Sequence, residues 1–251
     1  MIKNTVMLGV FASTIVSSLN AKAIEDKILK DQFVISGSLS FLTEYYWRGA
    51  TQTQGKPAVQ GILRMDHDTG VYAQIFASNI QLGIGSSLEF DYFLGYNYSL
   101  NDHLKLNLQY LDVNYPGKDK TLPQVDFEEY SLGLAASDLL RSDDQLDFSF
   151  YYSPDYTLET GKMLRYEAGY RFPINSKWGT YTQIGYNKFS SLDAYARLWD
   201  TDKKKYFYDY KVGVDLSFQN FIFDLYYADA NINKALSNAD STVVFSLSRM
   251  F

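Results

Sequence analysis

Long segments of this sequence alternate apolar and polar residues with a period of two. In residues 88–100 (LEFDYFLGYNYSL) the even positions carry Leu, Phe and Tyr, while the odd positions carry mostly Glu, Asp, Asn, Gly and Ser. The same alternation occupies residues 206–218 (YFYDYKVGVDLSF) and, over shorter lengths, residues 104–110 and 164–172. Such a period is that of a β-strand with one apolar and one polar face.

The length of these strands distinguishes a soluble sandwich from a membrane-spanning sheet, the two folds that would cover the apolar face. Strands of a soluble sandwich have about 5 to 6 residues, whereas a tilted strand that crosses a bilayer needs about 9 to 11. The segments here are of the longer kind. In residues 206–218 the three tyrosines come first, Val212, Val214 and Leu216 follow, and Phe218 ends the segment. This order matches an aromatic belt, a hydrocarbon band and a second belt.

The sequence therefore predicts an all-β fold, a transmembrane antiparallel up-and-down β-barrel of about twelve strands. The predicted strands are 33–47, 58–66, 71–79, 88–100, 104–115, 127–136, 145–152, 162–172, 178–189, 206–218, 221–228 and 241–251. Tight turns rich in Asn, Asp and Gly alternate with longer polar loops, which are 48–57, 80–87, 116–126, 153–161, 190–205 and 229–240. Outer-membrane barrels have short periplasmic turns and long extracellular loops, so with an even number of strands both chain termini are expected on the periplasmic side.

The first residues have the features of an export signal. Lys3 precedes an apolar stretch that ends in Ala21-Lys22-Ala23, an A-x-A cleavage pattern. We therefore expect a signal peptide over 1–23, a short periplasmic tail over 24–32 and the barrel over 33–251. A membrane anchor is the alternative, but the apolar core has about half of the roughly 20 residues needed. Alternating apolar residues that close on Phe251 resemble the signal read by the barrel assembly machinery.

Composition excludes several other classes. The chain has no cysteine, so it has no disulfide, no thiolate-ligated metal and no cysteine nucleophile. The formal net charge of −6 argues against nucleic acid as a partner, because phosphate contacts need clustered Lys and Arg. No motif calls for a cofactor or a metal ion. The expected location is the Gram-negative outer membrane, with lipid and lipopolysaccharide as neighbours.

One segment resembles a known family. Tyr46-Trp47-Arg48-Gly49, Gln52 and the short motifs within 57–61, 70–73 and 77–79 are similar to the signature of the TorF porin family. The resemblance is densest over residues 40–100. It implies an outer-membrane barrel of the porin kind and supplies no substrate.

Function is expected from the polar face, which should line the lumen. A twelve-stranded barrel lies between small barrels that are filled by side chains and large ones that hold an open channel. We predict passive diffusion of small hydrophilic solutes or ions through a constriction at which a wall of basic side chains faces a wall of acidic ones. The predicted channel-lining residues are Arg48, Arg64, Glu89, Asp91, Lys105, Arg165, Glu167, Arg171, Lys211 and Asp215, with Asp209 and Asp224 on the same face. For any one of them, an interstrand ion pair in a closed barrel is the competing interpretation.

Two rival functions remain. An enzyme is disfavoured, because His67 and His103 each lie in a tight turn and neither accompanies a serine nucleophile motif. A non-conducting structural or receptor barrel is the second rival, with the 190–205 loop and its Tyr195, Trp199 and lysines as the surface that contacts lipopolysaccharide or other ligands.

Overall fold

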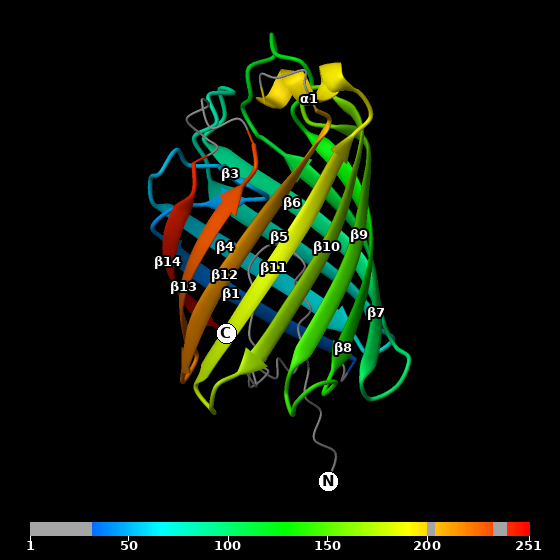
Figure 1. Ribbon diagram of the computed structural model, residues 1–251, viewed down its shortest axis with the longest axis vertical. Helices are drawn as coiled ribbons and strands as arrows, with labels where there is room; N and C mark the ends of the chain where they lie inside the picture. Colours follow the sequence, from blue (N-terminus) through cyan, green and yellow to red (C-terminus); the bar gives the residue numbers. More distant parts are fainter. Residues whose placement is uncertain (1–31, 200–203, 233–239) are drawn as a thin grey trace.

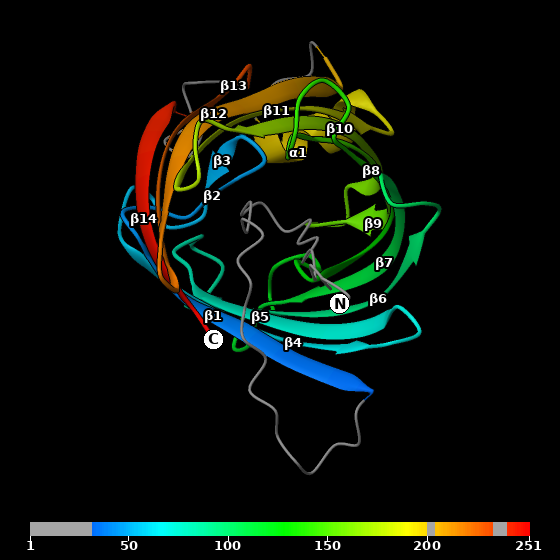
Figure 2. The same ribbon diagram turned by 90° about the horizontal axis from the view of Figure 1, so that it is seen from below.

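The computed structural model describes residues 32–199, 204–232 and 240–251. In this part of the chain, twelve strands pair with antiparallel neighbours to form a closed β-barrel (Figures 1 and 2). They are β1 (Phe33–Leu42), β4 (Ala58–His67), β5 (Val71–Asn79), β6 (Leu88–Ser99), β7 (Leu104–Asn114), β8 (Phe127–Ser137), β9 (Gln145–Tyr156), β10 (Gly161–Pro173), β11 (Trp178–Phe189), β12 (Tyr206–Phe218), β13 (Phe221–Ala230) and β14 (Thr242–Met250). The predicted fold class is confirmed.

Closure of the barrel depends on β1, which pairs with β4 on one side and with β14 on the other. The β1–β4 register runs from Phe33 opposite His67 to Leu42 opposite Ala58. Pairing with β14 covers the second half of β1 only, from Ser38 opposite Met250 onward. The sheet therefore closes on itself, as a bilayer demands.

The two faces of each strand meet different surroundings. In β12, Val212 is 50% exposed and points away from the lumen, whereas Asp215 on the other face is 3% exposed. The large exposed apolar side chains follow the rows that the sequence pattern assigns to lipid, and the buried charged side chains follow the opposite rows. Apolar groups outside and ionisable groups inside are the inverse of a soluble barrel.

The connections differ between the two ends of the barrel. We call the end with connections 68–70, 100–103, 138–144, 174–177 and 219–220 the turn end, and the opposite end the loop end. At the loop end the eight-residue helix α1 (Leu192–Trp199) lies over the mouth (Figure 1). Within the described residues, no helix has the length and apolar character needed to cross a bilayer.

Three sequence-based expectations need correction. A fourth, the signal peptide with its short tail, falls almost wholly on residues outside the described part of the chain. The predicted strand 33–47 ends at Leu42, because the chain then folds into the lumen. The predicted loop 153–161 is a tight connection, since β9 and β10 extend to Tyr156 and Gly161. The predicted loop 190–205 contains α1. The predicted signal peptide, 1–23, and all but the last residue of the predicted tail, 24–32, lie outside the described residues.

The lipid-facing assignment makes a direct prediction for Val212, which lies midway along β12. Val212→Arg should lower the free energy of unfolding by about 2–4 kcal/mol, because a cation at the bilayer midplane has no water to solvate it. Leu100→Arg, at the turn end, should cost about 1 kcal/mol or less. Urea titration of protein folded into lipid vesicles measures both. Equal losses for the two variants would contradict the assignment of Val212 to the hydrocarbon.

Candidate functional site

The chain between β1 and β4 folds into the barrel instead of projecting from it. Residues of β2 (Tyr46–Trp47) and β3 (Ala50–Thr51) pair as a small hairpin, which lies inside the ring of strands (Figure 2). Arg48 and Gly49 form its two-residue turn, with φ of 46° and 89°. Positive φ at both positions is typical of the hairpin turn that favours glycine. A Cβ at Gly49 would also come within 2.6 Å of the Ala230 Cβ.

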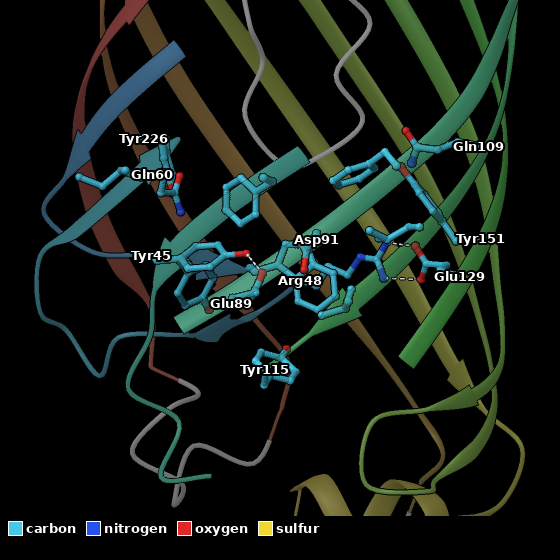
Figure 3. Close-up of a pocket in the computed structure, with 17 residues that line it drawn as sticks. Tyr45, Arg48, Gln60, Glu89, Asp91, Gln109, Tyr115, Glu129, Tyr151 and Tyr226 are labelled. Carbon is cyan, nitrogen blue, oxygen red and sulfur yellow. Dashed lines mark hydrogen bonds and ion pairs between the residues drawn. The ribbon is translucent and has the colours of Figure 1, made fainter. Parts of the chain in front are cut away.

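An ion pair attaches this hairpin to the barrel wall. The Arg48 guanidinium donates from Nη1 and Nη2 to the two carboxylate oxygens of Glu129 on β8, at 2.7 Å each (Figure 3). Its Cζ lies 4.4 Å from the ring centre of Trp47 and 4.7 Å from that of Tyr151. Burial alone would lower the pKa of Arg48, but the adjacent Glu129 carboxylate raises it above its usual value. The cation is therefore permanent and neutralised.

Beside this pair lies an acidic group from β6. Tyr45 donates its hydroxyl to Glu89 Oε1 at 2.9 Å, and Asp91 follows two residues later on the same face (Figure 3). Burial, and then the proximity of Glu89 and Asp91, raises the pKa of Tyr45 well above its usual value, so the phenol stays protonated. A cavity of about 40 Å³ lies between the hairpin and strand β6. Among its lining residues are Tyr45, Tyr46, Arg48, Glu89, Asp91, Phe93, Tyr115, Glu129 and Tyr226.

A second group of charges spans three neighbouring strands. Arg165 on β10 contacts Glu167 on its own strand at 2.6 Å and Asp209 on β12 at 3.0 Å. Asn187 on β11 donates to Asp209 at 2.6 Å. Nearer the turn end, Arg171 on β10 reaches Asp215 on β12 at 2.9 Å in the same way. Both arginines thus bond to a strand that is not their neighbour in the sheet.

Glycines on β11 allow the two arginines to cross it. Gly185 stands between Glu167 and Asp209 in the register, and a Cβ there would lie 2.2 Å from Arg165 Nη2. A Cβ at Gly179 would lie 2.6 Å from Arg171 Nη2. Each guanidinium therefore occupies the space that a side chain on β11 would fill.

The remaining predicted residues lie closer to the turn end or on the wall. Arg64 on β4 pairs with Asp66 at 2.7 Å and stacks over Tyr72 at 3.6 Å from the ring centre. Lys211 on β12 lies 6.0 Å and 5.8 Å from the ring centres of Tyr181 and Tyr226. Lys105 is half-buried near the end of β7.

The structure places all ten predicted residues on or inside the inner surface, but it mixes their charges. Arg165 meets Glu167 and Arg171 meets Asp215, so basic and acidic side chains do not form the two separate walls that the sequence suggested. The partners Glu129 of Arg48 and Asp66 of Arg64 were missed. Asp66 lies two positions after Arg64 on one strand face, a spacing that could have found it. The sequence carries no such signal for Glu129, which is 81 residues from Arg48.

A closed antiparallel barrel with an apolar outer face and a charged inner face has the architecture of outer-membrane β-barrels. A family model described as "Bacterial protein of unknown function (Gcw_chp)" matches residues 29–251, and the chain belongs to that family. Membership supplies no activity, since the family's function is unknown. No curated protein matches the sequence.

Solved structures with a similar fold include porins. The NanC porin aligns with a TM-score of 0.55 and 9% identity over 86% of this chain and 98% of that chain. OccD3 of Pseudomonas aeruginosa aligns with a TM-score of 0.46 and 11% identity over 88% of this chain, which spans 65% of OccD3. LpxR of Salmonella typhimurium aligns with a TM-score of 0.48 and 10% identity, covering 86% of this chain and 99% of that chain. At 9% identity, the NanC likeness shows a shared fold.

Because Arg165 crosses β11 at Gly185, a single methyl group added there should destabilise the fold. Gly185→Ala should lower the free energy of unfolding by about 1–3 kcal/mol, because the new Cβ displaces a guanidinium fixed by two carboxylates. Gly61→Ala on β4 is the matched control, since a Cβ there meets no atom within 4 Å and should change stability little. Urea titration in detergent micelles compares the two. A neutral Gly185→Ala would contradict the close approach of Arg165.

The Arg48–Glu129 pair makes a separate prediction. Arg48→Ala leaves the Glu129 carboxylate buried and unpaired and should cost about 3–5 kcal/mol, whereas Arg48→Met with Glu129→Leu should recover most of that loss. Arg197→Ala, which breaks the exposed pair of Arg197 with Asp193 on α1, should cost under about 0.5 kcal/mol. Denaturant unfolding of these three variants, together with the single variants Arg48→Met and Glu129→Leu, measures the coupling. Additive losses at 48 and 129 would show that the pair is not formed.

Proposed function

We propose that this protein is a narrow porin-like channel that lets small hydrophilic solutes or ions diffuse across the Gram-negative outer membrane. One observation carries the proposal: ionisable side chains line the inner face from Arg64 and Asp66 near the turn end to Arg48 and Glu129 near the loop end. Charged groups on that scale must be paired or hydrated, because burying them dry costs several kcal/mol each. A barrel of twelve strands leaves room for a narrow aqueous path along them.

The inward hairpin is the constriction of this channel. It narrows the lumen from one side, and its Arg48 stands across the 40 Å³ cavity from the β6 carboxylates. A solute that passes here meets fixed charges of both signs and aromatic rings within a few ångströms. The geometry suits small, strongly hydrated or dipolar solutes more than large ones.

Family, location and partners form part of the same proposal. The Tyr46–Trp47 strand and the Arg48-Gly49 turn, which carry the resemblance to the TorF porin family, are the residues that build the hairpin. An apolar outer face suits contact with membrane lipid and lipopolysaccharide. We propose that the strand ending in Phe251 is the part that the barrel assembly machinery recognises.

A non-conducting structural or receptor barrel is the second candidate, and one observation favours it. Tyr195 and Trp199 of α1 pack with Phe189 and Phe207 at the loop end, with ring centres 5.5–6.5 Å apart. An aromatic layer of this kind closes part of the mouth. Replacing 190–205 by a short linker should then abolish lipopolysaccharide binding.

Planar-bilayer recording tests the channel and its constriction together. Wild-type protein should give resolvable single channels, and replacing residues 45–54 by Gly-Ser-Gly should raise their conductance, because the hairpin leaves the lumen. Replacing residues 119–122, in another loop-end connection, by Gly-Ser is the control and should leave the conductance unchanged.

The fold of each variant is checked by the heat-dependent shift of its electrophoretic mobility. Folded wild-type protein that yields neither channels nor sugar permeation into liposomes would contradict the channel and leave the receptor barrel.

A further inference from the structure

The acidic side of the cavity carries two carboxyl groups without a basic partner. Glu89 and Asp91 lie two residues apart on the inner face of β6. They are 4% and 5% exposed. Neither takes part in any ion pair found among the described residues. Two adjacent carboxylates repel one another unless a proton or a cation lies between them.

The nearby Arg48 guanidinium does not neutralise Glu89 and Asp91. Both amino groups of the Arg48 guanidinium are bonded to Glu129 at 2.7 Å, and its faces are covered by Trp47 and Tyr151. Its charge is therefore already balanced by Glu129. Glu89 has the Tyr45 hydroxyl as its donor, which is neutral.

Two residues that line the cavity also have a buried side-chain oxygen without a hydrogen-bond partner in the described part of the chain. Asp91 Oδ1 and the Tyr46 hydroxyl have no hydrogen-bond partner among the described residues, and both residues line the cavity. Tyr46 belongs to the hairpin and is 7% exposed, so it is an observation independent of the acidic pair. Buried polar atoms without partners are rare and point to a missing water or ion.

We propose that this cavity binds a small monovalent cation, an alkali-metal ion or the ammonium group of a small amine, and that bound cations make the channel cation-selective. The carboxyl oxygens of Glu89 and Asp91 would contact the cation. A cavity of about 40 Å³ exceeds the roughly 10–15 Å³ that one water requires, so it admits an ion or an ammonium group with little water.

The composition of the walls selects among cations. Ca²⁺ takes six to eight oxygen ligands, and the described residues contain no group of three or more His, Cys, Asp or Glu side chains that could hold a metal ion. Phe93 and Tyr115 line the same cavity, and aromatic faces attract K⁺ and ammonium groups. The selectivity part of this inference rests on the proposed channel function, whereas binding does not.

Binding is tested first, without conductance. Infrared difference spectra of the folded protein in detergent, between KCl or methylammonium chloride and the bulky N-methyl-D-glucamine chloride, should show shifted carboxylate bands. The bands should vanish in Glu89→Gln/Asp91→Asn and persist in Asp102→Asn/Asp240→Asn, which removes two exposed carboxylates outside the cavity. The single variant Asp91→Asn, with bands much reduced, replaces the double variant if that fails to fold.

Selectivity is tested next, by reversal potentials in a KCl gradient. Wild-type and control channels should favour K⁺ over Cl⁻, and the permeability ratio should fall at least severalfold in Glu89→Gln/Asp91→Asn. Wild-type protein without cation-dependent bands would overturn the site even if channels form, because the pair then shares only a proton. Cation-dependent bands without channels would keep the site and remove the channel.

Discussion

Every other feature of this protein depends on satisfying backbone hydrogen bonds where water is absent. A bilayer offers no partner to a free N–H or C=O group, so a sheet can cross it only when closed. The closure is made by β1, whose residues pair on both sides, and Phe251 extends it by exchanging backbone hydrogen bonds with Gly37 in both directions. With the backbone satisfied in the ring, side chains on the two faces are free to suit two different solvents.

This arrangement places charged side chains on the inner face, where each must be paired or hydrated. Alternation puts about half of each strand inward, and in this chain many of those residues are ionised. Several of these charges are balanced within the wall by contacts of two kinds: along one strand face, as in Arg64 with Asp66, and across an intervening strand, as in Arg171 with Asp215. The second kind needs a glycine between the partners, so Gly179 and Gly185 decide which charges meet.

Much of the fold could be predicted because the period of two and the turn residues are local signals. The strand of residues 206–218, for example, has the same bounds in sequence and structure. The inward hairpin and the Arg48–Glu129 pair could not, because they depend on which distant strands face each other across the lumen, and one sequence does not specify that register. Helix α1 had a local signal that was overlooked: Ser191 Oγ accepts a hydrogen bond from the Ala194 N–H, as an N-cap residue does.

The ion pairs show where some of the acidic groups behind the net charge of −6 lie. Each lumen arginine has at least one carboxylate partner, namely Glu129, Asp66, Asp215, or Asp209 together with Glu167. Further carboxyl groups on the inner wall accept hydrogen bonds from neutral side chains: Glu89 from Tyr45, Asp224 from Tyr181 and Asp147 from Gln145. Part of the chain's negative charge therefore lies along the inner wall, where low-dielectric surroundings strengthen its field. A mobile cation in the lumen is favoured by that field before it meets any particular side chain.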